Sequence, residues 1–221
     1  MSRELGVLRD SGWLAEQPND FRDAIAGIGR WRRLPAGHVL WQPGDPADAM
    51  FGVGDGAVEH QYPLDPDFLT PTYWAERGAW FGDSETLAGA ARLGAMTVAR
   101  EAALFVVPGR ALRALLDRRP DWWRHLYALR VRNTGRILAL AAEALALSTS
   151  GRVARQLLAL AGTGAEVAIT QSELAPLVGA TRASVGRALT ELAADGLLER
   201  GYGRIRILDR KGLARILGPR G

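Results

Sequence analysis

The stretch "ITQSELAPLVGATRASVGRALTELAADGLLERGYGRIRIL", residues 169–208, decides the fold of the C-terminal part of the chain. Thr170 and Glu173 fit a capping box, in which each side chain binds the other residue's backbone N–H and so begins a helix. That helix is short and ends at Gly179, and Thr181 can cap a second helix almost at once. Two short helices joined by a tight glycine turn predict a helix-turn-helix.

The second helix has an apolar face and a polar N-terminal end. Its helical periodicity predicts a buried face made of Val185, Ala188, Leu189 and Leu192. A helix N-terminus attracts phosphate through its free N–H groups, and arginine matches O6 and N7 of guanine. We therefore predict DNA contacts by Thr181, Arg182, Ser184 and Arg187, with a solvated polar face as the alternative. Residues 197–208 alternate polar and apolar around Gly-Tyr-Gly, which predicts a small hairpin, or wing.

Charge and composition narrow the class of protein. Residues 151–221 contain 11 Lys and Arg against 6 Asp and Glu, whereas residues 1–150 contain 17 against 18, so the positive excess lies in the C-terminal third. This asymmetry favours a polyanion as partner. No apolar run reaches the roughly 18 residues of a membrane span, and the charged N-terminus does not read as a signal peptide. We expect a soluble, cytoplasmic protein with no membrane partner.

The chain contains no cysteine among its 221 residues. This excludes disulfides, thiolate zinc sites, thiol catalysis and cysteine-held iron–sulfur clusters. His38, His60 and His125 are scattered along the chain and are expected to be packing or surface residues rather than metal or haem ligands. We find no paired-carboxylate, Ser/His/Asp or phosphate-loop pattern, so we do not expect an enzyme.

Residues 33–107 alternate short apolar runs with Gly and Pro turn signals, which predicts a small antiparallel barrel or sandwich and an α+β fold overall. Asp55–Gly56, with apolar runs on both sides, is expected to be the turn of a hairpin. Residues 108–119 then predict a short helix that stops at Pro120.

A long helix is expected from Asp121, as N-cap, to about residue 148. One apolar line recurs at three- and four-residue steps: Leu126, Leu129, Asn133, Ile137, Leu140, Ala144 and Leu147. A second line, Val131, Leu138 and Leu145, has heptad spacing. A helix that is apolar on two sides needs two partners. We predict the chain's own barrel on one side and the same helix of a second copy on the other, with Asn133 on that seam; burial within a monomer is the alternative.

The small polar residues of "STSGR", 148–152, favour a hinge. We therefore predict three parts: a sensor domain at 1–120 with short flanking helices, a dimerisation helix at 121–148, and a winged helix-turn-helix at 149–221.

From about residue 20 to 210 the chain resembles the Crp/Fnr (catabolite activator protein) family of bacterial transcription regulators, most closely in residues 169–198. The resemblance implies that Arg182, Ala183 and Arg187 occupy the three base-reading positions. The middle position is commonly Glu, which accepts from cytosine, whereas Ala183 can only contact a thymine methyl. The resemblance also implies phosphate contacts by Thr170, Gln171, Ser172, Thr181 and Ser184.

Residues 34–59 resemble the opening of a cyclic-nucleotide-binding β-roll, and residues 80–101 resemble its phosphate-binding cassette. The effector positions implied by this resemblance are Gly82, Asp83, Arg92, Leu93, Ile137 and Leu138. Nucleotide binders carry Glu, a small or hydroxyl residue, and a Thr-Ser pair where this chain has Asp83, Leu93 and Ile137–Leu138. These departures argue against cyclic AMP. A different nucleotide, a more apolar effector and no small ligand stay open, as does a structural Arg92 paired with Asp83.

The resemblance implies a homodimer that binds double-stranded, palindromic DNA, with RNA polymerase as a further partner. A small effector other than cyclic AMP is expected to act at the β-roll. The alternative is a cyclic-nucleotide-type sensor that acts through a protein partner rather than DNA, although the basic C-terminal third argues against it.

Overall fold

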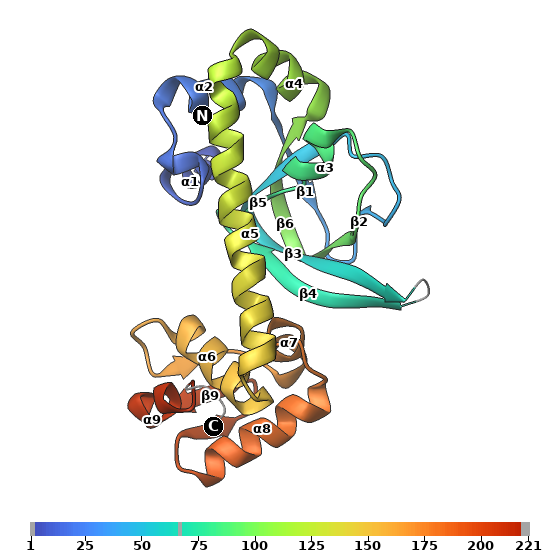
Figure 1. Ribbon diagram of the computed structural model, residues 1–221. Helices are drawn as coiled ribbons and strands as arrows, with labels where there is room; N and C mark the ends of the chain where they lie inside the picture. The colour runs from blue at the N-terminus through green and yellow to red at the C-terminus, as the bar shows by residue number, and fades with distance from the viewer. Residues whose placement is uncertain (1–2, 66–67, 218–221) are drawn as a thin grey trace. The chain divides into compact units, whose positions relative to one another are not determined.

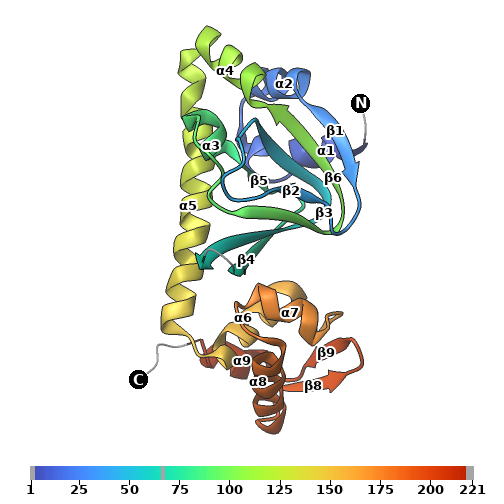
Figure 2. The same ribbon diagram turned by 90° about the vertical axis from the view of Figure 1, so that its right-hand side faces the viewer.

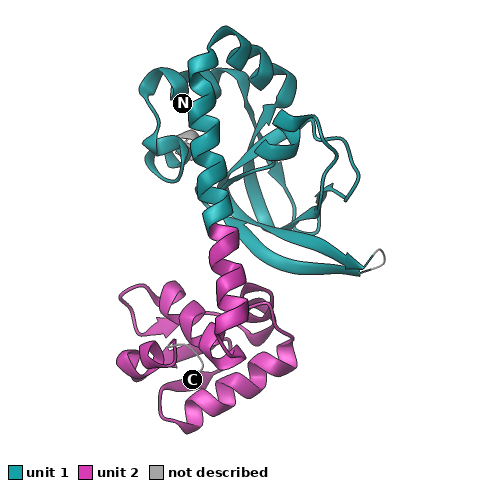
Figure 3. Cartoon of the chain, in the orientation of Figure 1, with its two compact units in different colours: residues 1–135 teal, residues 136–221 magenta. Residues whose placement is uncertain are grey.

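The computed structural model describes residues 3–65 and 68–217, and the chain forms two compact units (Figure 3). The first unit spans residues 1–135 and the second residues 136–221, so the division falls inside the long helix. The limits expected at 120 and 148 stay predictions. Within the described residues, no helix is both long enough and apolar enough to cross a membrane.

The first unit is an antiparallel sheet with helices at its ends (Figures 1 and 2). The main strand order is β1-β6-β3-β4, β2 pairs with β6 and β5 pairs with β3. The elements in chain order are α1 (Arg3–Asp10), a 3₁₀ turn (Leu14–Glu16), α2 (Asn19–Ile28), β1 (Arg30–Leu34), β2 (Val39–Trp41), β3 (Ala49–Asp65), β4 (Phe68–Glu76), β5 (Trp80–Phe81), α3 (Asp83–Ala88), β6 (Ala95–Pro108), α4 (Gly109–Arg118), a second 3₁₀ turn (Pro120–Trp122) and α5 (Trp123–Ala146).

Two apolar cores hold this unit together. Inside the roll, the rings of Trp41, Phe51 and Phe81 lie with centroids 5.4–5.8 Å apart. A second core joins the N-terminal helices, α4 and the start of α5 around Trp13 and Phe21. The Trp13 indole Nε1 donates to the His125 backbone carbonyl at 2.8 Å, so this buried polar group is satisfied.

The hairpin expected at Asp55–Gly56 is wrong, because β3 runs through these residues to Asp65 and turns only toward β4. Its pairing with β6 shifts register on both sides of Asp55, which makes this position a β-bulge. Gly56 has φ 78°, and a Cβ there would lie 2.0 Å from the Glu101 carbonyl oxygen. The glycine therefore serves a bulge and a close approach of strands rather than a turn.

The long helix α5 begins at Trp123, not with Asp121 as its N-cap. Asp121 lies in the 3₁₀ turn and accepts two hydrogen bonds from the Arg119 guanidinium, at 3.2 and 3.1 Å. Asn133 Nδ2 donates to the Trp80 carbonyl oxygen at 3.1 Å, so this side chain contacts the chain's own roll. Its expected place on an intermolecular seam stays a prediction. The first predicted apolar line of this helix therefore faces the chain's own roll at Asn133. Leu126 and Leu129, on the same line, are buried.

The second unit contains α6 (Thr149–Ala161), β7 (Glu166–Val167), α7 (Gln171–Leu177), α8 (Arg182–Ala194), β8 (Leu198–Gly201), β9 (Arg204–Ile207) and α9 (Arg210–Arg215). The break before α6 falls where small polar residues favour a hinge: Ser148 is the N-cap and its Oγ accepts from the Gly151 N–H at 3.0 Å. The three strands pair in the order β7-β9-β8 beside the helices, which confirms the winged helix-turn-helix.

Candidate DNA-binding surface and effector site

The first helix of the helix-turn-helix, α7, is closed by the expected capping box. Thr170 Oγ1 accepts from the Glu173 N–H at 3.2 Å, and Glu173 Oε2 accepts from the Thr170 N–H at 2.8 Å. Gly179, with φ 59°, makes the turn that leads to α8. Thr170 and Ser172 are exposed and Gln171 is half-buried, so the start of α7 presents polar side chains to solvent.

The second helix of the helix-turn-helix, α8 (Figure 2), has one buried face and one exposed face, as predicted. Thr181 is its N-cap, with Oγ1 accepting from the Ser184 N–H at 3.1 Å. The predicted core residues Val185, Ala188, Leu189 and Leu192 are all buried. The predicted base-reading residues Arg182, Ala183 and Arg187 are exposed.

Ser184 has a local role that the sequence did not indicate. The Arg187 guanidinium Nη2 donates to Ser184 Oγ at 3.0 Å, and the Thr181 hydroxyl donates to the same oxygen at 3.0 Å. The two predicted phosphate-contacting hydroxyls therefore orient Arg187 toward the N-terminal end of α8. A side chain that is already oriented loses fewer rotamers on binding a partner.

Arg200, on β8, is a candidate site residue that sequence reasoning missed. Its Nη1 donates to the Thr190 hydroxyl of α8 at 2.7 Å, which fixes the guanidinium against the outward face of the recognition helix. The signal present in the sequence was an arginine directly before the Gly-Tyr-Gly turn. Only the pairing of the wing with α8 shows that this arginine lies beside Thr190.

The expected effector residues fall into two groups. Gly82, Asp83 and Arg92 come together, because Arg92 Nη1 donates to the Gly82 carbonyl oxygen at 3.0 Å and Asp83 follows at the start of α3. Leu93 is 65% exposed and makes no part of this cluster. Ile137 and Leu138 belong to the second unit, where both are exposed.

Arg92 is turned into the roll and is only 3% exposed. Its Nη2 donates to the Ala49 carbonyl oxygen at 2.6 Å, and its guanidinium carbon lies 4.0 Å from the centre of the Trp41 ring. Burial lowers the pKa of Arg92, and the carboxylates of Glu85, Asp48 and Asp83 act against that shift. The nearest of them, Glu85 Oε2, is 3.8 Å from Nη1.

Asp83 is also buried, and burial raises the pKa of its carboxyl above the ordinary value. Its Oδ2 accepts from the Ser84 hydroxyl at 3.3 Å and its Oδ1 from Asn133 Nδ2 at 3.4 Å. Arg92 forms no direct hydrogen bond to Asp83 within the described residues. The alternative of a structural Arg92 is therefore supported by the carbonyls of Gly82 and Ala49 rather than by Asp83.

Two features of these residues disfavour a cyclic nucleotide. A cyclic phosphate would need the guanidinium of Arg92. Its Nη1 and Nη2 each donate one hydrogen bond to a backbone carbonyl, its Nε is buried without a hydrogen-bond partner among the described residues, and the Glu85 carboxylate lies 3.8 Å from Nη1. A ribose hydroxyl would need the Asp83 carboxylate, which is 4% exposed and faces Asn133.

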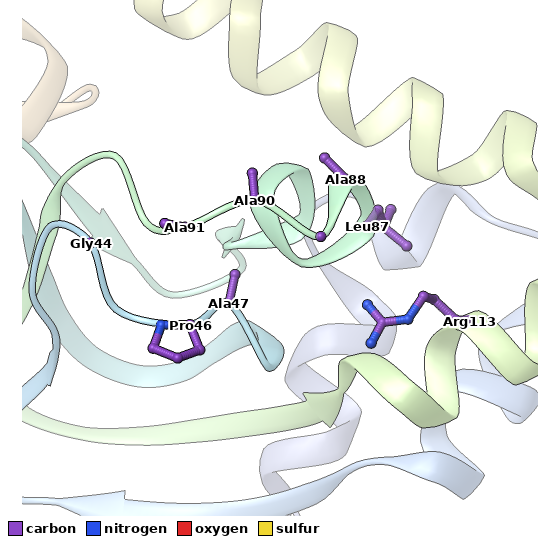
Figure 4. Close-up of a pocket in the computed structure, with 9 residues that line it drawn as sticks. Gly44, Pro46, Ala47, Leu87, Ala88, Ala90, Ala91 and Arg113 are labelled. Atoms are coloured by element: carbon purple, nitrogen blue, oxygen red, sulfur yellow. The ribbon is translucent and has the colours of Figure 1, made fainter.

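A pocket of ≈ 590 Å³ lies beside α3 (Figure 4). It is lined by Gly44, Pro46, Ala47, Leu87, Ala88, Gly89, Ala90, Ala91 and Arg113. Arg113 is the charged residue of this lining, and its Nη1 donates to the Thr86 carbonyl oxygen at 2.5 Å. Across residues 3–65 and 68–217, no group of three or more metal-ligating side chains is assembled.

His60 and His125 both contact neighbouring side chains of the first unit. His60 Nδ1 lies 2.6 Å from the Thr72 hydroxyl and its ring stacks on Tyr73, while His125 Nδ1 lies 2.7 Å from Gln17 Oε1. Burial lowers the pKa of both imidazoles.

Family models match both halves of the chain. Residues 31–119 match the cyclic nucleotide-binding domain, and residues 151–216 match the Crp-like helix-turn-helix domain. These are the β-roll with α4 and the unit that contains α7, α8 and the wing.

Individual proteins match along most of the chain. The transcriptional regulator SdrP of Thermus thermophilus is 30% identical over 196 residues, which cover 84% of this chain and 93% of SdrP. A CRP-like cAMP-activated global transcriptional regulator of Mycobacterium tuberculosis is 29% identical over 193 residues, 82% of this chain and 85% of the relative. A solved CRP/FNR-family regulator from Thermus thermophilus has a TM-score of 0.69 and 25% identity, covering 87% of this chain and 100% of its own.

Proposed function

The chain belongs to the Crp/Fnr family of transcriptional regulators, and on this premise we propose that it binds a palindromic DNA site as a homodimer. Like its relatives, which are transcriptional regulators, it is a DNA-binding regulator and not an enzyme. In each protomer, the N-terminal turn of α8 enters the major groove, where Arg182 and Arg187 donate to guanines. Ala183 leaves the middle position without a hydrogen bond.

The observation that carries this proposal is the distribution of unpaired charge in the second unit. Four of its other arginines pair with carboxylates: Arg155 with Glu143 at 2.8 Å, Arg204 with Glu166 at 3.5 Å, Arg206 with Glu199 at 4.0 Å and Arg215 with Asp209 at 3.4 Å. Arg152 and Arg210 donate to backbone carbonyls. Arg182, Arg187 and Arg200, in contrast, form no ion pair with any carboxylate of the described chain, and all three are exposed.

Positive charge without a carboxylate partner on one face of a winged helix-turn-helix favours DNA phosphates and base edges. Thr170, Gln171, Ser172 and Thr181 lie at the starts of α7 and α8, where backbone N–H groups also attract phosphate. We propose these four as phosphate contacts, with Ser184 orienting Arg187.

The second apolar line of α5, which has heptad spacing, supports the homodimer. Val131, Leu138 and Leu145 are 59%, 64% and 84% exposed in the single chain and recur every seven residues. An apolar heptad line on an exposed helix is stabilised by pairing with a second copy. Helix-turn-helix dimers read two half-sites about 34 Å apart, and the two-fold symmetry of such a dimer makes the site a palindrome.

One further partner and a compartment complete the proposal. A regulator bound at a promoter acts on RNA polymerase, which we propose as the protein partner of the DNA-bound dimer. We propose the cytoplasm as its location, because its DNA target and the polymerase are there.

The test is selection of binding sites from random DNA with the full-length protein, followed by gel-shift titration. We expect a palindrome with a guanine in each half-site. Arg187→Ala is expected to cost about 1–3 kcal/mol and relax one base position. The matched control is Arg206→Ala, which removes an arginine already paired with Glu199 and should leave the selected sequence unchanged. Equal binding to all sequences would contradict base reading, and no DNA binding would favour a protein partner instead.

A further inference from the structure

Carboxylates are gathered around the buried arginine of the roll. Three carboxylates act on Arg92, those of Glu85, Asp48 and Asp83. The imidazole of His60, also inside this region, adds no compensating positive charge, because burial favours its neutral form and lowers its pKa. An anion that entered here would meet an arginine whose charge is already offset.

Glu85 has the position of an internal counter-ion. It lies on α3, one turn from Gly82, and its carboxylate is 3.8 Å from Arg92 Nη1 and 22% exposed. The side chain is therefore at the edge of the cassette, between solvent and the guanidinium. An ion pair here is screened less than one on the surface, because Arg92 itself is almost fully buried.

The start of α5 closes the same cassette from outside. Arg130 Nη1 donates to the Ser84 hydroxyl at 2.5 Å, and Asn133 Nδ2 donates to the Trp80 carbonyl oxygen at 3.1 Å. Both contacts join α5 to the residues directly before or within α3. The chain's own side chains thus hold the cassette against the helix without a ligand between them.

We propose that Glu85 is the built-in counter-ion of Arg92 and that the roll therefore excludes anionic cyclic nucleotides. For the regulator proposed above, it follows that DNA binding does not depend on such a nucleotide. Any molecule that acts at this roll must be uncharged or cationic.

The first test is calorimetric titration of the full-length protein with cyclic AMP and with cyclic GMP. Wild type is expected to show no saturable binding up to about 1 mM nucleotide, which corresponds to a binding free energy weaker than about −4 kcal/mol. Glu85→Gln removes the carboxylate charge and is expected to bind at least one of the two nucleotides at least tenfold more tightly than wild type. The control Glu101→Gln removes an exposed carboxylate 3.6 Å from Arg33 in the same domain and should behave as wild type.

A second measurement keeps the proposal testable if Glu85→Gln does not bind. Thermal unfolding is followed for Glu85→Gln in the wild-type background and in an Arg92→Leu background. Glu85→Gln should lower the unfolding temperature in the first and have much less effect in the second, because its partner is then missing.

Three results would overturn the proposal. They are saturable nucleotide binding by wild type that Arg92→Leu abolishes, equal losses of unfolding temperature in both backgrounds, and a tenfold gain in DNA affinity on adding a cyclic nucleotide. If no DNA binds under any condition, the proposed function fails, but the calorimetry and the unfolding measurements still decide the role of Glu85.

Discussion

Arg200 offers a sharp test of the proposed DNA surface, because its contribution has a calculable salt dependence. The guanidinium is held by Thr190 on the outward face of α8 and pairs with no carboxylate of the described chain. From the wing side of the recognition helix we expect it to contact a DNA phosphate. Arg200→Ala should then weaken binding to all sequences alike, without changing the preferred site.

The magnitude follows from counter-ion release. Each phosphate contact contributes about 0.9 to the slope of log K against log salt concentration, so a homodimer that loses two contacts has a slope lower by about 1.8. Between 50 and 200 mM salt, a fourfold change, the affinity lost through Arg200→Ala should therefore be about 12-fold larger at the lower salt concentration.

The assay is fluorescence anisotropy with the selected DNA site at several salt concentrations. Arg206→Ala is the matched control, because Arg206 is on the same small sheet but has Glu199 and Glu166 as cross-strand neighbours. Its slope should change much less. A loss of affinity for Arg200→Ala that is the same at 50 and 200 mM salt, or a slope change equal to that of Arg206→Ala, would refute the reasoning.

Three further outcomes are expected. Leu138→Glu places a charge on the exposed heptad line of α5 and should shift the protein from dimer to monomer in light scattering; an unchanged mass would remove the seam argument. Thr170→Ala breaks the capping box of α7 and should lower the free energy of unfolding by about 1 kcal/mol in urea titrations, whereas a change within error would show that the cap is not used. The pKa of folded His60 is below its ordinary value of 6.5, so the folded protein binds fewer protons than the unfolded chain as pH falls through 6.5; stability present above that pH is then lost. His60→Gln should flatten this loss in thermal unfolding at a series of pH values, and an equally steep loss would assign it to other groups.

The DNA-binding half could be predicted from the sequence because its signals are local. A capping box involves residues three apart, and a buried helix face repeats every three or four residues. The roles of Thr170, Glu173 and Val185 could therefore be predicted from neighbouring residues alone. What the sequence did not contain was the hydrogen bonding of the exposed residues. Ser184 was expected to contact phosphate and is used to orient Arg187, because two donors reach the same oxygen.

The sensor half was predicted less well, since its features depend on distant contacts. The Asp55–Gly56 pair has the composition of a turn, but its approach to Glu101 makes it a bulge in a long strand. Asn133 matched the spacing of an intermolecular seam, but the carbonyl that it binds belongs to Trp80, 53 residues earlier in the chain.

The sequence by itself determined the family, the α+β architecture and the face of α8 that can read DNA, since each rests on short-range periodicity, capping and charge. Only the tertiary structure decided the state of Arg92. Its position in the sequence predicts an anion-binding arginine or a structural one with equal force. The choice depends on the Ala49 carbonyl, 43 residues away, which accepts from Nη2, and on the Trp41 ring, which lies 4.0 Å from the guanidinium carbon.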